Sequence, residues 1–209
     1  MLRIILTLLV IFIALLTNEA LWRKKIIKNE VARKTIHISV AVFAAFWPYY
    51  LSYKNIDLIA VAFIIVIILS HFLGLFPSIK QVKRITLGDY FFPIGILVVA
   101  LVAPQKEIFT VAMLCVGLGD GFAALIGQRY GSHNRYHVFN GFKSIAGSLT
   151  VFISSLVVLL LANYFGHMDL PVLSLIVMPL DVAIVEAIAP FGSDDLLIPL
   201  TVLLILNAL

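Results

Sequence analysis

The chain has little of several things that soluble proteins usually contain. It has a single cysteine, Cys115, so an internal disulfide and a metal site built from several cysteines are excluded. Only 12% of its 209 residues are charged, against about 25% in ordinary soluble domains. The sequence shows no internal repeat, whereas many transporters are built from repeated halves. A separate soluble domain is therefore not expected.

Apolar residues are abundant instead, at 62% of the chain. A helix needs about 20 mostly apolar residues to cross a bilayer, and eight stretches qualify, the fourth and eighth being short. The sequence therefore predicts an all-α fold, a polytopic transmembrane helical bundle with about eight spans, forming one domain over residues 1–209. The predicted spans are residues 2–20, 36–53, 56–76, 89–103, 108–127, 144–165, 171–189 and 196–209.

Basic residues set the predicted orientation, because loops rich in lysine and arginine stay in the cytoplasm. With the N-terminus outside, the outer segments hold only Arg3, Lys54 and Lys106 of the 15 basic residues. The inner loops hold Arg23, Lys24, Lys25, Lys28, Arg33, Lys34, Lys80, Lys83, Arg84, Arg129, Arg135 and Lys143. This loop chemistry accounts for the net charge of +4, so nucleic-acid binding is not expected. Trp47 and its neighbouring tyrosines are expected at the outer interface.

The first apolar stretch is followed by basic residues rather than by an Ala-x-Ala cleavage site, so it is expected to be a retained span. The short chain and the lack of a targeting extension favour a prokaryotic plasma membrane.

Asp120 is the most informative charge, because a carboxylate inside a span is costly and usually functional. Glycines surround it in residues 117–131, and glycine lets a backbone or a ligand approach closely. Such a carboxylate suits a divalent cation that carries phosphate. The alternative is helix packing through small residues, which explains the glycines but not the aspartate.

A second polar segment, residues 140–148, leads into the sixth predicted span. Lys143, Ser144 and Gly147 there suit a phosphate cradle, because helix N-termini attract anions. The spacing is not that of a Walker A motif. The alternative is a lysine whose head reaches toward water beside a serine that caps the helix.

Arg33, Lys34 and His37 open the second span at spacings that place them on one helix face. This face could clamp a phosphate, with His37 as acid or base. Ordinary basic flanking explains the first two residues well but explains His37 poorly.

Carboxylates also border the connection between the last two spans. Glu186 lies within a span, and Asp194 and Asp195 follow in the loop, where they could complete a metal site. Asp89 lies at the same predicted membrane face and could equally cap the fourth span.

In this order the segments resemble those of the CTP-dependent polyprenol kinase family, which includes dolichol, phytol and farnesol kinases and a CTP-dependent diacylglycerol kinase. The resemblance covers residues 33–209, with residues 1–32 as a peripheral span and basic loop. Asp89 stands where the family usually has glutamate, and Asp195 where asparagine is common. The matching pieces are Arg33-Lys34-x-x-His37, residues 88–93, residues 119–123 with Gly127 and Gly131, residues 143–148, Glu186, and residues 194–199.

The resemblance implies transfer of the γ-phosphate of CTP to an isoprenoid alcohol at the cytoplasmic face. It implies Mg²⁺ on Asp120, with Glu186 or Asp195 as further ligands, and developing charge neutralised by Arg33 and Lys34. The triphosphate is expected on Arg129, Lys143, Ser144 and Gly147. The base that takes the hydroxyl proton is His37 or Asp89. Cytidylyl transfer to a phospholipid and transport of a small solute are the alternatives.

Overall fold

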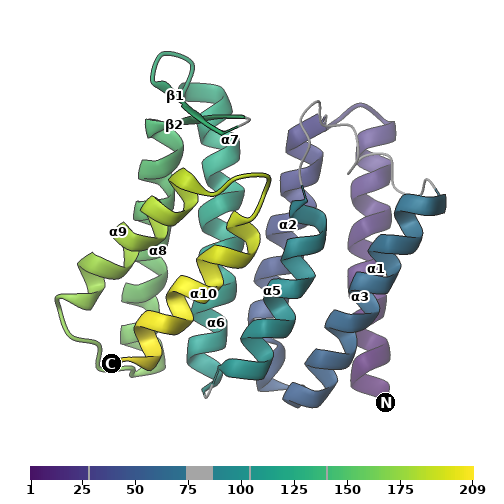
Figure 1. The fold of residues 1–209 in the computed structure, drawn as a ribbon. Coiled ribbons are helices and arrows are strands. Elements are labelled where there is room, and N and C mark those ends of the chain that lie inside the picture. The colour runs from purple at the N-terminus through teal and green to yellow at the C-terminus, as the bar shows by residue number, and fades with distance from the viewer. Residues whose placement is uncertain (28, 74–86, 104, 140) are drawn as a thin grey trace.

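A computed structural model describes residues 1–27, 29–73, 87–103, 105–139 and 141–209 as a bundle of helices with one small hairpin (Figure 1). The helices and 3₁₀ turn of the first half are α1 (Leu2–Arg23), α2 (Asn29–Ala45), η1 (Trp47–Tyr49), α3 (Tyr53–Leu73) and α5 (Gly88–Val102). The second half holds α6 (Lys106–Leu114), η2 (Cys115–Asp120), α7 (Gly121–Tyr130), β1 (Arg135–Val138), β2 (Gly141–Ser144), α8 (Ile145–Gly166), α9 (Ser174–Ile188) and α10 (Asp194–Asn207).

Helices stand at all eight predicted spans in the described part of the chain, which confirms an all-α membrane protein apart from the hairpin. Four helical stretches are long and apolar enough to cross a bilayer: α1, α3, α8 and the continuous rod Lys106–Tyr130. The others, α2, α5, α9 and α10, have 17, 15, 15 and 14 residues. Eight spans with the N-terminus outside therefore stay a prediction. Among the basic residues used for it, Lys28, Lys80, Lys83 and Arg84 lie outside the described residues.

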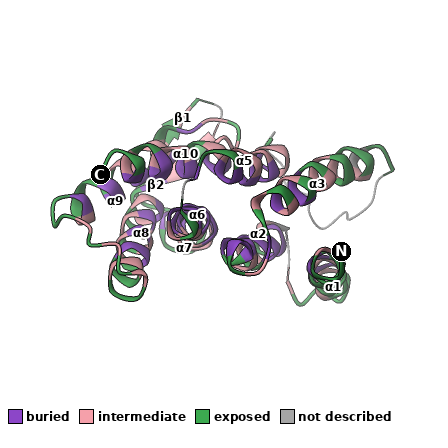
Figure 2. Cartoon of the chain, turned by 90° about the horizontal axis from the view of Figure 1, so that it is seen from below, coloured by how far each residue is buried: buried purple, intermediate pink, exposed green. Residues whose placement is uncertain are grey.

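The rod Lys106–Tyr130, made of α6, η2 and α7, forms the centre of the bundle. In Figure 2 it is seen end-on, with α2, α8 and α10 around it. Of its most apolar window 67% is buried, against 28% or less for the other three long stretches. Glycine permits this packing, because a Cβ on Gly117 would lie only 2.6 Å from the Cβ of Ala41. The close approach at Gly117 agrees with the alternative interpretation of these glycines, helix packing through small residues.

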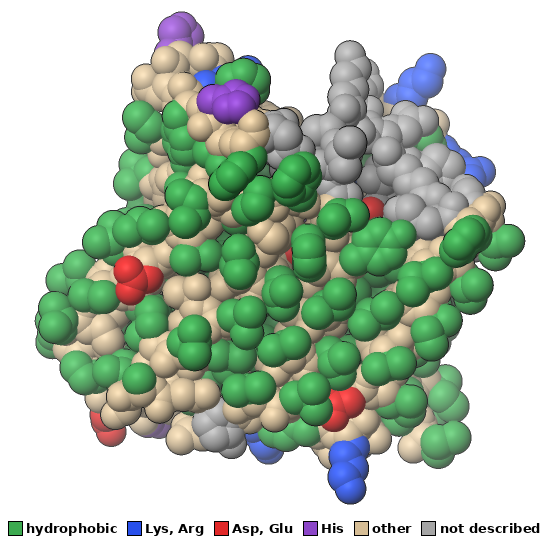
Figure 3. Space-filling view, viewed as in Figure 1, with side chains coloured by type: hydrophobic (Ala, Val, Ile, Leu, Met, Phe, Trp, Pro, Cys, Tyr) green, Lys and Arg blue, Asp and Glu red, His purple; other side chains and the backbone are tan. Residues whose placement is uncertain are grey.

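The outer surface is apolar. Figure 3 shows hydrophobic side chains over most of one face, with lysines and arginines at its upper and lower edges. Such a face suits lipid tails, and it leaves few sites for charge except at the two ends of the bundle.

Trp47 corrects one expectation about the interface. Its side chain is fully buried rather than placed among lipid headgroups. The ring packs edge-on against Phe43 at a centroid distance of 6.1 Å, because η1 turns the chain back into the bundle between α2 and α3. Tyr49, in the same turn, is 52% exposed as expected.

The hairpin β1–β2 was not expected from the sequence, which indicated only a loop there. Its strands pair antiparallel, with Arg135 opposite Ser144 and His137 opposite Phe142. It lies at the upper end of the bundle in Figure 1, beside α7 and α8. This position brings loop residues over the polar end of the central rod.

Candidate active site

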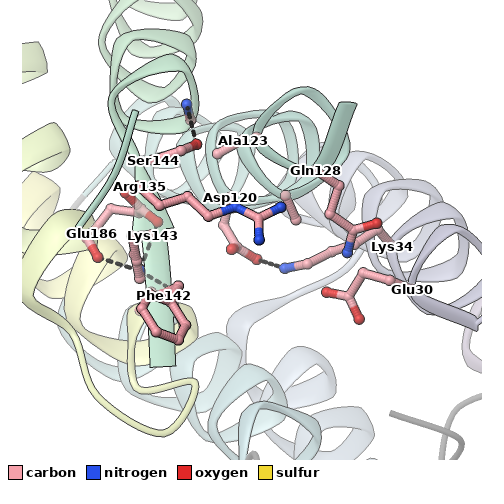
Figure 4. A pocket seen from close by; sticks show the side chains of 14 residues that line it. Glu30, Lys34, Asp120, Ala123, Gln128, Arg135, Phe142, Lys143, Ser144 and Glu186 are labelled. Carbon is pink, nitrogen blue, oxygen red and sulfur yellow. Dashed lines mark hydrogen bonds and ion pairs between the residues drawn. The ribbon is translucent and has the colours of Figure 1, made fainter. Parts of the chain in front are cut away.

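A cavity of ≈ 250 Å³ opens at the upper end of the bundle. Segments far apart in the sequence meet there: the start of α2, the central rod, the hairpin, and the ends of α8, α9 and α10 that face the hairpin (Figure 4). It is lined by Glu30, Lys34, Asp120, Ala123, Ala124, Gly127, Gln128, Arg135, Phe142, Lys143, Ser144, Gly147, Glu186 and Asp194.

Asp120 lies in the wall of this cavity at the end of η2, which is a π-helical turn. Such turns are rare and often mark functional sites, because they interrupt the regular hydrogen bonding of a helix. The Lys34 ammonium donates a hydrogen bond to the Asp120 carboxylate, and both residues are less than 5% exposed. The structure thus joins two predicted site residues that are 86 positions apart.

His37 lies about one helical turn beyond Lys34 on α2 and is close to Asp120. Its Nε2 atom is 3.5 Å from a carboxylate oxygen of Asp120 and 3.5 Å from one of Asp195. Its ring also packs against Phe92 of α5 at a centroid distance of 4.8 Å. His37, Asp120 and Asp195 therefore form one compact acid–base group behind the cavity.

Lys143 reaches from β2 to the opposite wall. Its ammonium lies 2.6 Å from Glu186 Oε1 and 3.1 Å from Asp194 Oδ2, and it also donates to the Glu186 carbonyl. Burial alone lowers the pKa of Lys143, but these two carboxylates outweigh burial and raise it well above its ordinary value. The Lys143 head is therefore held by carboxylates of α9 and α10 rather than reaching into water, unlike in the alternative interpretation.

Ser144 caps α8, as the alternative interpretation of this segment expected. Its hydroxyl accepts a hydrogen bond of 3.1 Å from the Gly147 backbone N–H. Gly127 makes room for this cap, because a Cβ on it would lie 2.8 Å from the Ser144 hydroxyl oxygen. Lys143, Ser144 and Gly147 do line the cavity together, so a cap and an anion site can share this helix end.

Five predicted residues lie outside the cavity lining: His37 and Asp195, which form a group with Asp120, and Arg129, Asp89 and Arg33. The Arg129 guanidinium is exposed and lies 5.6 Å from the centre of the Tyr130 ring. Asp89 is in the first turn of α5. Arg33 is 5% exposed and forms a two-bond pair with Glu30, at 2.5 and 3.0 Å, so it supports the lining residue Glu30 from behind.

Sequence reasoning missed Arg135 and Phe142 as lining residues, and it gave Glu30 no role. The hairpin register reveals Arg135, because it places Arg135 opposite Ser144, whereas Phe142 directly precedes Lys143 in the sequence. The Arg135 side chain also has no hydrogen-bond or ion-pair partner within the described residues, so its charge is available to a ligand.

The carboxylates fit a divalent cation. Oxygen atoms of Asp120, Glu186 and Asp194 lie within 4.8 Å of one another, and oxygen ligands are what Mg²⁺ prefers. Glu186 Oε2 is buried without a hydrogen-bond partner in the described structure, a state that costs about 1–3 kcal/mol unless a ligand relieves it. The predicted trio of Asp120, Glu186 and Asp195 is divided, because Asp195 joins Asp120 and His37 in the second group.

Several named proteins are similar to this chain. A phytol kinase from Synechocystis is 34% identical over 88% of this chain and 82% of its own length. This chain belongs to the phytol kinase family. This membership confirms the resemblance of its motifs to those of the polyprenol kinases, a group that includes the phytol kinases. Probable chloroplastic phytol kinases from wheat and rice are each 28% identical, over 90% and 89% of this chain and 70% and 66% of their own lengths.

These alignments span most of the chain. No family model matches the chain, and no solved structure matches it.

Proposed function

We propose that this phytol kinase family member transfers the terminal phosphate of CTP to the hydroxyl of an isoprenoid alcohol, with phytol as the first acceptor to test. The observation that supports the proposal most strongly is the cavity in which Lys34, Arg135 and Lys143 face Asp120, Glu186 and Asp194. Phosphoryl transfer needs mainly positioning and neutralisation of charge, which such a set of side chains supplies.

The charges in the lining favour a metal–nucleotide complex over a free nucleotide. Three cations face four carboxylates there, and Lys34 and Lys143 are each engaged by a carboxylate. A triphosphate alone would meet a surface with no surplus of positive charge. Magnesium, held by Asp120, Glu186 and Asp194, would neutralise the phosphate oxygens when bound. The grouping favours Asp194 over Asp195 as the third ligand.

The chain's own residues then hold the reactants. Arg135 extends over the cavity in Figure 4 and supplies the uncommitted cation for the phosphates. Lys143 stands beside the N-terminus of α8, and Lys34 stands beside Asp120, so the phosphate chain lies between two fixed ammonium groups. Arg33, one residue from Lys34, adds a buried positive charge behind Glu30.

The reaction joins the acceptor's hydroxyl oxygen to the γ-phosphorus, and the bond from that phosphorus to the β-phosphate oxygen breaks. CDP leaves, and the hydroxyl proton goes to a side chain of the site. Of the two bases expected from the sequence, the position of His37 beside Asp120 favours it over Asp89. The lipid tail stays in the bilayer against the apolar face of the bundle, with its hydroxyl at the polar end.

The cavity lies at the bundle end that carries α1's basic C-terminus and the hairpin. The excess of basic residues there supports a cytoplasmic active site.

Analysis of the nucleotide products tests this proposal. Purified protein in detergent is given CTP, Mg²⁺ and phytol, and the products are separated. CDP together with phytyl monophosphate supports the kinase. A parallel reaction contains phosphatidate in place of phytol. Pyrophosphate with a CMP-containing lipid from that reaction, and no phytyl monophosphate from the first, indicates cytidylyl transfer instead and contradicts the proposal. ATP in place of CTP tests the choice of donor, and EDTA tests the metal.

A further inference from the structure

The cavity is too small to enclose the whole of the proposed nucleotide donor, CTP. Its ≈ 250 Å³ lies below the about 300–1,000 Å³ of pockets that enclose a complete drug-sized ligand. Its polar walls suit the phosphates and the metal. The base and ribose of the donor must therefore lie over the rim, where the hairpin stands.

One side chain at this rim is unlike the rest. Phe142 is the only aromatic residue among those that line the cavity in the described structure, and its side chain is 65% exposed. In Figure 4 its ring lies at the edge of the site, below Lys143. Phe142 is thus an exposed apolar ring that borders a cavity with charged walls, where a ligand in the cavity would contact it.

The ring is also held in place before any ligand arrives. His137 lies directly opposite Phe142 in the hairpin register, and the two rings meet edge to face, with centroids 5.2 Å apart and planes at 83°. Edge-to-face pairs stabilise a fixed arrangement of rings. A cross-strand pair on a short hairpin thus gives Phe142 a defined orientation at low entropic cost.

We propose that Phe142 is the platform on which the base of the nucleotide donor stacks. The inference rests on the proposed kinase function and extends it to the base. Stacking on an aromatic ring accepts any base, because every base presents a π face. Phe142 therefore contributes affinity for the nucleoside, while Lys143, Arg135 and the carboxylates bind the phosphates and metal.

Phe139 provides a matched control. It belongs to the same hairpin connection and is 69% exposed, but it does not line the cavity. If exposed aromatic side chains serve only to hold the hairpin in the membrane interface, changes at Phe139 and Phe142 should have equal effects. If Phe142 stacks on a base, only its own substitution should weaken nucleotide binding.

The test compares Phe142→Leu, Phe142→Trp and Phe139→Leu for the KM of CTP, for kcat, and for inhibition by inorganic tripolyphosphate. Loss of stacking at this exposed rim should raise KM about 5- to 30-fold, which is about 1–2 kcal/mol at 1.4 kcal/mol per tenfold change. We expect kcat and the inhibition constant of tripolyphosphate to stay unchanged in Phe142→Leu. Phe142→Trp should keep the wild-type KM, and Phe139→Leu should match wild type throughout.

An unchanged KM in Phe142→Leu overturns the proposal. So does an equal loss of tripolyphosphate binding, which indicates a distorted cavity, or an equal effect in Phe139→Leu, which indicates membrane anchoring. If the wild-type protein forms no lipid phosphate, the kinase function itself fails. The same variants are then compared by calorimetric binding of Mg²⁺–CTP, where the same rise in Kd supports stacking and an unchanged Kd overturns it.

Discussion

Removing the Lys143 side-chain charge should show how strongly it offsets the repulsion among the carboxylates of the site. Its ammonium holds Glu186 and Asp194 together, and both lie with Asp120 inside a 4.8 Å group. Two like charges 4.8 Å apart repel by about 3.5 kcal/mol at an effective dielectric constant near 20. Breaking a buried ion pair by removing one partner typically costs about 3–5 kcal/mol.

The variant Lys143→Met should therefore lower the free energy of unfolding by about 3–5 kcal/mol, which lowers Tm by roughly 6–20 °C for a chain of this size. Added Mg²⁺ should restore much of this loss, because the ammonium no longer competes with the metal for carboxylate oxygens. A cation at about 100 times its Kd stabilises the folded state by about 2.7 kcal/mol. Wild type should gain less from the same addition.

The assay is thermal unfolding of the detergent-solubilised protein, with and without MgCl₂. Lys143→Arg keeps the positive charge and should stay close to wild type in Tm. Lys106→Met removes a lysine of the opposite end of the bundle and should change little, because Lys106 has no carboxylate partner among the ion pairs of the described residues. A Lys143→Met protein that melts like wild type, or that gains nothing extra from Mg²⁺, would refute this account of the charges.

Two further substitutions probe the geometry. Arg135→Gln should raise the KM for CTP about tenfold without lowering Tm, because a charge-assisted phosphate contact is lost while no internal ion pair breaks. Arg129→Gln, outside the cavity, is the control. Equal effects of the two substitutions on KM would contradict the role assigned to Arg135. Gly127→Ala should destabilise by about 1–3 kcal/mol and reduce activity, because its Cβ meets the Ser144 hydroxyl at 2.8 Å. Gly119→Ala, with its nearest neighbour at an ordinary 3.6 Å, should be tolerated, as melting curves will show.

The positions of most helices could be predicted from the sequence, because a long apolar run indicates a membrane-spanning helix. The predicted span 144–165 corresponds to α8, Ile145–Gly166. The second span was predicted from residue 36, yet α2 begins at Asn29. Its first turns are polar, so the apolar residues alone place its start too late, although the spacing of Arg33, Lys34 and His37 already indicated a helix there.

The sequence indicated several residues of the site, among them Asp120, Lys34, Lys143 and Glu186, but not how they pair. Asp194 and Asp195 are neighbours in the first turn of α10, so their side chains point about 100° apart around the helix axis. The sequence cannot tell which of them faces Glu186 and which faces His37. The relative rotation of the helices decides this, and it depends on packing throughout the bundle.

The hairpin residues were missed for another reason. Four-residue strands in a polar loop carry no periodic signal, and their pairing is fixed only when Arg135 and Ser144 meet across the turn. The resemblance to polyprenol kinases supplied Lys143 and Ser144 but gave no role to Arg135 or Phe142, which are known only from the fold.

The most direct measurement follows the transferred phosphate. Wild type and Asp120→Asn, in the same detergent, are incubated with γ-radiolabelled CTP, Mg²⁺ and phytol, and the lipids are extracted and separated. Asp120 belongs to both acid–base groups of the site, so we expect labelled phytyl phosphate from wild type and none above background from the variant. A folded wild-type protein that labels no lipid alcohol, or an Asp120→Asn protein that labels it at the wild-type rate, would contradict the account.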